Sequence, residues 1–72
     1  MTERERIEDL LRTEHDDYDE WDTFSQLSAT TTVWLYERGV DLELFKLPTK
    51  QQMMACMLDI MPEELSSVAG RA

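Results

Sequence analysis

The sequence predicts an all-α fold: a single small helical domain, residues 1–72, with four to five short helices and a central helix over about residues 18–38. The stretch 21–38, WDTFSQLSATTTVWLYER, is apolar on two sides at helical spacing and is closed by Gly39. Three capping-box patterns, at 2–5, 17–20 and 49–52, indicate helix starts. The alternating run 40–47 also fits a strand, but no partner strand is predicted that would satisfy its backbone.

The central helix is expected to pack against neighbours on both sides. Its main apolar face comprises Phe24, Leu27, Thr31 and Trp34 with Trp21 and Leu35 at the margin, and its weaker stripe comprises Ala29, Val33, Tyr36 and Val40. Gly39 can take the left-handed conformation that ends a helix.

A first helix is predicted from about Glu3 to Glu14. Thr2 and Glu5 have capping-box spacing, in which each side chain satisfies a free backbone donor. The apolar stripe of this helix is narrow and consists of Ile7, Leu10 and Leu11. Glu8 and Arg12 are predicted to form an i, i+4 ion pair.

The run 14–22, EHDDYDEWD, holds six acidic residues in nine positions. In one continuous helix many of them would be like-charged neighbours at i, i+3 and i+4, which favours a break. Asp17 and Glu20 are predicted to cap the start of the central helix. Since neither Gly nor Pro forces the break, a single helix over 3–38 remains the alternative.

The C-terminal half is predicted to add the remaining helices. Residues 41–47 form one or two helical turns. Thr49 and Gln52 then open a helix that continues to Met61 and is apolar on nearly every side after its first turn. A last short helix is predicted over 62–69.

The charge balance excludes direct nucleic-acid binding. Sixteen Asp and Glu face seven Lys and Arg, a net charge of −9, whereas binding to phosphate backbones depends on clustered Lys and Arg. There is no secretory hydrophobic segment at the N-terminus and no apolar run of about 20 residues, so we expect a cytoplasmic protein without membrane contact. A high-salt cytoplasm explains the acidity as well as a binding surface does.

No catalytic, cofactor or metal site is predicted, and we expect a protein that is not an enzyme. Cys56 is the single cysteine and lies among apolar residues, which is typical of a small buried side chain. His15 is a solvated linker residue, and nothing pairs it with a nucleophile. Asp17 and Asp19 begin as an EF-hand loop does, but Trp21 then occupies a ligand position.

The stretch 36–53, YERGVDLELFKLPTKQQM, resembles the middle of a SAM domain, in which a glycine and an acidic residue precede a leucine-rich turn and a capped helix. The leucine-glycine step of that family is replaced here by Met53, Met54, Ala55 and Cys56, so the family is not assigned. The resemblance implies a role in protein association.

The methionine-rich helix is the first candidate interaction surface. Unbranched, polarizable side chains can repack against a partner, and so many are more than a small monomer can bury. We expect a homodimer or a complex with another protein, formed by Met53, Met54, Met57 and Met61, together with Trp21 and Trp34 where these are exposed.

The acidic run is the second candidate surface. Carboxylates at helical spacing stand about 5 to 6 Å apart, comparable with neighbouring phosphates. The alternative function is therefore an acidic nucleic-acid mimic that inhibits a DNA- or RNA-handling machine, of the kind that phages and mobile elements encode. Its surface would consist of Glu14, Asp16, Asp17, Asp19, Glu20 and Asp22.

Overall fold

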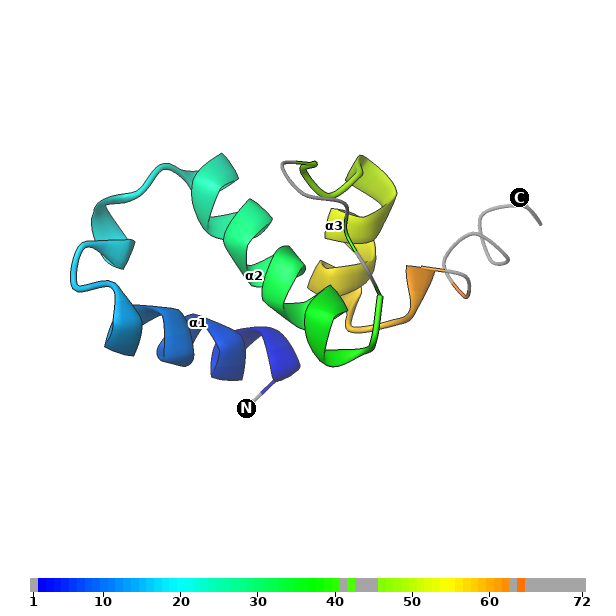
Figure 1. Ribbon diagram of the computed structural model, residues 1–72, viewed down its shortest axis with the longest axis horizontal. Coiled ribbons are helices and arrows are strands. Elements are labelled where there is room, and N and C mark those ends of the chain that lie inside the picture. Colours follow the sequence, from blue (N-terminus) through cyan, green and yellow to red (C-terminus); the bar gives the residue numbers. More distant parts are fainter. Residues whose placement is uncertain (1, 41, 43–45, 63, 65–72) are drawn as a thin grey trace.

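The helices pack on both sides of a central one in the computed structural model, which describes residues 2–40, 42, 46–62 and 64. Their order is α1 (Glu3–Glu14), the 3-10 helix η1 (Tyr18–Glu20), α2 (Thr23–Glu37) and α3 (Lys50–Leu58), and no strand occurs in this part of the chain. α1 and α3 both pack on α2 (Figure 1). The predicted all-α class and the central position of the second helix are therefore confirmed.

The predicted count of four to five helices differs from the three α-helices that the described residues contain. Two of the expected segments, 41–47 and 62–69, lie largely outside the described residues. The alternative of a strand over 40–47 also falls mainly outside them.

α1 has the predicted bounds because its cap forms as the sequence indicates. Thr2 Oγ1 accepts a hydrogen bond from the backbone N–H of Glu5 at 3.1 Å. The Glu5 carboxylate accepts from the Thr2 hydroxyl at 3.3 Å. The predicted partner of that carboxylate was the Thr2 backbone N–H, so the capping box is present in one direction.

The break between the first two helices is real, but α2 starts later than predicted. Asp17 makes no side-chain capping hydrogen bond, and Asp22 Oδ1 instead accepts from the N–H of Ser25 at 2.8 Å. The predicted start at residue 18 is wrong, and so is the alternative of one helix over 3–38. The physical reason is the burial of Tyr18, which holds the intervening chain in a 3-10 turn.

Tyr18 anchors this connection from inside. Its side chain is 1% exposed, and its hydroxyl donates a hydrogen bond to Glu8 at 3.0 Å. Gln26 on α2 donates to the Tyr18 carbonyl at 2.9 Å. Burial, followed by the hydrogen bond to Glu8, raises the pKa of Tyr18 to about 12.

The core is small and draws on every described helix. Its buried apolar side chains are Ile7 and Leu11 of α1, Tyr18 of η1, Trp34 and Leu35 of α2, and Ala55 and Cys56 of α3. Three polar side chains of α2 are buried beside them: Ser28, Thr30 and Thr31. The two threonine hydroxyls donate to the Leu27 carbonyl, at 3.0 and 2.7 Å.

The C-terminal ends of α2 and α3 are joined through Asp59. Its carboxylate accepts hydrogen bonds from Arg38 at 3.2 Å and from the Trp34 indole at 3.4 Å. The Arg38 guanidinium lies 4.0 Å from the centroid of the Trp34 ring, a cation–π contact. Gly39, at φ +80°, ends α2 in the predicted left-handed conformation.

α3 starts as predicted and ends early. Thr49 and Gln52 form the complete capping box. The helix stops at Leu58 because Asp59 is left-handed, at φ +58°, and the N–H of Ile60 turns back to the Ala55 carbonyl at 3.0 Å. The predicted continuation to Met61 is therefore wrong.

The buried hydroxyl of Ser28 gives the first prediction. Ser28 Oγ has no hydrogen-bond partner among the residues that the structure describes. Ser28→Ala removes this unsatisfied group and improves helix propensity, so the free energy of unfolding should rise by about 1 kcal/mol in urea denaturation.

Thr31→Val is the matched control for Ser28→Ala. It removes a hydroxyl that is hydrogen-bonded at 2.7 Å, and should lower the free energy of unfolding by about 1 kcal/mol. A loss of stability in Ser28→Ala as large as that in Thr31→Val would contradict the assignment of Ser28 as unsatisfied.

The raised pKa of Tyr18 gives a prediction for alkaline pH. The unfolded phenol loses its proton near 10.0 and the folded one near 12. The contribution of the neutral phenol is therefore complete below pH 10 and is lost as the pH rises to about 12. Urea denaturation across this range should show a steeper decline for the wild type than for Tyr18→Phe, and parallel curves would refute the prediction.

Candidate functional site

α3 leaves most of its apolar surface uncovered on one side. Met54 and Met57 are each 53% exposed and Leu58 is 58% exposed, while Ala55 and Cys56 are fully buried. At 3.6 residues per turn, positions 54, 57 and 58 project from the same side of the helix. We define Met54, Met57 and Leu58 as the outer face of α3.

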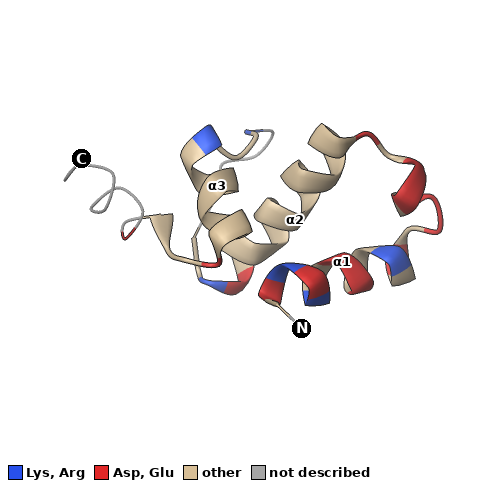
Figure 2. Ribbon diagram, turned by 180° about the vertical axis from the view of Figure 1, so that it is seen from behind, with Lys and Arg blue, Asp and Glu red and all other residues tan. Residues whose placement is uncertain are grey.

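The outer face carries no charge of its own. In Figure 2 charged residues crowd α1 and the η1 connection, whereas α3 is uncharged from Gln51 to Leu58. Met53 and Met61 are half-buried, and Met61 lies beyond the end of α3. Of the four methionines that the sequence assigns to this surface, Met54 and Met57 are therefore the most exposed.

The two tryptophans do not extend the outer face. Trp34 is 0% exposed and belongs to the core, so the expectation that it contributes to docking is corrected. Its burial follows from the position of α2 between the two other helices. Trp21 is half-buried, and its ring centroid lies 5.2 Å from those of His15 and Tyr18.

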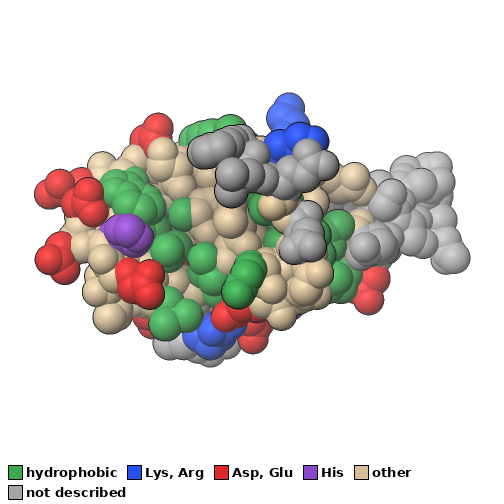
Figure 3. Space-filling model, viewed as in Figure 1, with side chains coloured by type: hydrophobic (Ala, Val, Ile, Leu, Met, Phe, Trp, Pro, Cys, Tyr) green, Lys and Arg blue, Asp and Glu red, His purple; other side chains and the backbone are tan. Residues whose placement is uncertain are grey.

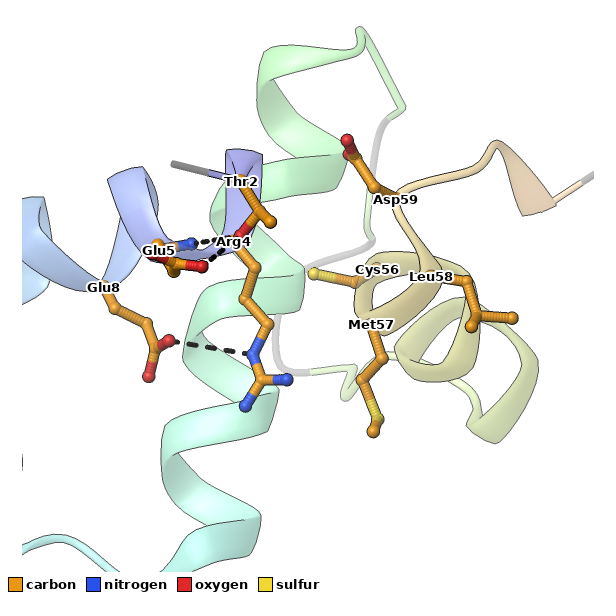
Figure 4. A pocket seen from close by; sticks show the side chains of 8 residues that line it. All are labelled: Thr2, Arg4, Glu5, Glu8, Cys56, Met57, Leu58 and Asp59. Carbon is orange, nitrogen blue, oxygen red and sulfur yellow. Dashed lines mark hydrogen bonds and ion pairs between the residues drawn. The ribbon is translucent and has the colours of Figure 1, made fainter.

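A groove of about 440 Å³ lies beside the outer face, between α1 and the C-terminal end of α3 (Figure 4). α1 contributes Arg4, Glu5 and Glu8 to its lining, and α3 contributes Met57 and Leu58. The Arg4 side chain extends from α1 toward α3, and Met57 lies beside it. One wall of the groove is thus charged and the other apolar.

Arg4 separates this groove from a smaller hollow of about 90 Å³, which reaches Leu27 on α2. Arg4, Glu8 and Met57 line both spaces. Arg4 Nε lies 3.7 Å from the Glu8 carboxylate, and this buried nitrogen has no hydrogen bond to any described residue. The Arg4 side chain is 39% exposed overall, so part of it is open to water.

The carboxylates of the groove differ in how far they are already satisfied. Glu8 lies by Arg4 and accepts from the Tyr18 hydroxyl at 3.0 Å. Asp59, at the end of α3, is paired with Arg38. Glu5 is exposed, and its carboxylate accepts a hydrogen bond from the Thr2 hydroxyl. Glu5 is therefore the groove acid most available to a further partner.

Sequence reasoning missed the contribution of α1 to this site. It paired Glu8 with Arg12, whereas Glu8 lies by Arg4, and Arg12 is bound to Asp9 at 3.2 Å and Asp19 at 2.9 Å. The i, i+4 spacing of Arg4 and Glu8 was a usable signal for that pair. No local signal shows which face of α1 lies opposite α3.

The acidic run forms one end of the molecule, where Figure 3 shows red side chains around His15. All six of its members are exposed: Glu14, Asp16, Asp17, Asp19, Glu20 and Asp22. They do not share one helix, because η1 contains only Asp19 and Glu20. Asp19 is bound to Arg12, and Asp22 caps α2, which lowers the pKa of Asp22 through its hydrogen bonds to Ser25.

The structure separates the two residues considered for catalysis. Cys56 is buried in the core, and burial raises the pKa of its thiol. His15 is exposed and contacts Trp21. Within the described ranges no group of three or more His, Cys, Asp and Glu side chains is placed to hold a metal ion.

Comparisons with protein-family models, with curated proteins and with solved structures found no match for this chain. The resemblance of residues 36–53 to a SAM domain thus gains no support from them. Among the described helices, none is long and apolar enough to cross a membrane.

Proposed function

We propose that this protein is a non-enzymatic interaction module that docks on another protein through the outer face of α3. The observation that carries the proposal is the exposure of Met54, Met57 and Leu58, each more than half exposed and adjacent on one helix. Grouped apolar side chains at the surface are characteristic of protein-binding sites, and methionine adapts to the shape of a partner.

The groove beside Met57 provides a recess in this docking surface. An apolar side chain of the partner that enters the 440 Å³ groove would contact Met57 and Leu58 and lose its own contact with water. Central, desolvated contacts of this kind carry most of the binding free energy in protein interfaces. A homodimer formed through the same face is the alternative form of this docking.

A second candidate function is nucleic-acid mimicry by the acidic run. It is favoured by the exposure of all six carboxylates at one end of the molecule. Among the six, Asp19 is bound to Arg12 and Asp22 caps α2. The side chains of the other four, Glu14, Asp16, Asp17 and Glu20, make no hydrogen bond or ion pair with the described residues, so a basic partner would meet these charges unopposed. Neutralising Asp16, Asp17 and Glu20, which lie outside the α-helices, tests mimicry.

Retention of proteins from a cell lysate by the immobilised chain distinguishes the two functions. Met57→Lys should abolish retention of proteins bound by the wild type, because it places a charge in the apolar interface. The matched control is Leu10→Lys: Leu10 is 47% exposed and does not line the groove. It makes the same change in charge and should leave retention intact.

The triple variant Asp16→Asn, Asp17→Asn, Glu20→Gln tests mimicry. If the acidic run binds the partner, this variant should lose retention of lysate proteins, and retention by the wild type should fall steeply as salt increases. Docking through α3 predicts little change. Circular dichroism shows whether each variant folds. The mass in solution detects a homodimer, since one chain has a mass of 8.5 kDa. Equal retention by wild type and Met57→Lys would refute docking through α3.

A further inference from the structure

We propose that the groove between α1 and α3 receives a basic amphipathic helix of the partner protein. Apolar side chains of that helix enter beside Met57, and its Lys or Arg side chains meet the carboxylates of α1. This inference rests on the proposed docking function and specifies the chemistry of the partner.

The shape and the apolar lining of the groove suit the apolar side of a helix. Met57 and Leu58 form one wall of a groove of about 440 Å³, and Met54 continues the apolar surface outward. A partner helix that lies in a groove presents side chains at i, i+3, i+4 and i+7 along one stripe. The part of the chain that the structure describes has no strand, so it offers no sheet edge to an extended peptide.

The wall that α1 contributes to the groove is charged. Glu5, Glu8 and Arg4 line the groove on this side, so this wall has one more negative charge than positive. Glu5 retains the capacity to accept hydrogen bonds from a partner. If a Lys or Arg of a partner helix lies over this wall, the apolar side chains of the same helix lie on the Met57 side. This separation of charged and apolar side chains is that of an amphipathic helix.

The described arginines are already engaged by carboxylates of the same chain, so they do not repel a cationic partner as free charges would. Each described arginine is already in an ion pair: Arg4 with Glu8, Arg6 with Glu3 and Glu37, Arg12 with Asp9 and Asp19, and Arg38 with Asp59. The whole chain has a net charge of −9. A cationic partner is therefore attracted at long range, and its approach is accelerated.

The same charges disfavour the other occupants of the groove. A second copy of the chain would bring another −9 to the interface, and like charges across an interface oppose association. An acidic partner meets the same repulsion. A basic helix is the occupant for which the apolar wall and the charged wall both contribute to binding.

The test uses the full chain and two fluorescently labelled synthetic helices of about five turns. One has a leucine face and a lysine face, and its twin has glutamate in place of every lysine. Fluorescence anisotropy measures their affinities. The lysine helix should bind, with an affinity that falls as salt increases, and the glutamate twin should not.

Four variants, each of which raises the net charge by one, locate the binding. Met57→Lys should weaken the lysine helix by tenfold or more, and Glu5→Gln by about threefold, the effect of one partly exposed charge pair. Gln at position 5 also suits a capping box, so α1 keeps its start. Leu10→Lys and Glu14→Gln change side chains outside the groove and should alter the affinity by less than twofold.

Each contrary result overturns the inference in a recognisable way. Equal weakening by all four variants shows that binding follows net charge alone, and no binding of the lysine helix shows that the groove does not take it. Tighter binding of the glutamate twin reverses the charge of the partner, and a stable dimer that blocks the lysine helix makes a second copy the occupant. In each case, the proposed docking function stands if the wild type retains lysate proteins and Met57→Lys does not. If retention does not depend on Met57, the docking function and the basic-helix proposal both fail.

Discussion

The enclosed indole of Trp34 holds the described helices together. Its indole lies in the core formed by all the described helices and is fully enclosed. Arg38 covers the ring, and Asp59 binds both the indole N–H and the guanidinium. Because Asp59 also ends α3, the same contacts that enclose the tryptophan determine where the third helix stops and how its end is held against α2.

This small core explains why α3 has an apolar outer face. α3 contributes only Ala55 and Cys56 to the fully buried cluster, since these are the side chains that face α2. A chain of 72 residues has too little mass to cover the opposite side of every helix, and small domains leave a large fraction of their surface exposed. The uncovered side carries Met54, Met57 and Leu58. Along one edge of this side, α1 supplies the acidic wall of the groove.

Local sequence signals predicted the fold class and the helix starts that depend on a single cap. The Thr49 and Gln52 box forms in full, and α1 has its predicted bounds. The start of α2 was not predictable from spacing, because Asp17 and Asp22 are both acids that precede polar and apolar residues. Burial of Tyr18 decides between them, and burial is a property of the folded chain.

The enclosure of Trp34 was not predictable for the same reason. Periodicity predicted a methionine surface that includes the exposed Met54 and Met57, but helical spacing gives the faces of a helix and not what covers them, so it could not show that Trp34 is buried. The groove joins Glu5 of α1 to Met57 of α3, which are far apart in the sequence. Contacts of this kind depend on how the helices pack on α2.

Solvent access to the methionine methyl groups shows whether α3 has an open apolar face in solution. In a sample with 13C-labelled methionine methyls, a dissolved nitroxide broadens the NMR signals of exposed groups. The account predicts strong broadening for Met54 and Met57, which are each 53% exposed, and weaker broadening for the half-buried Met53 and Met61. Equal protection of all four in the isolated monomer would show that α3 has no open apolar face, and would contradict the account.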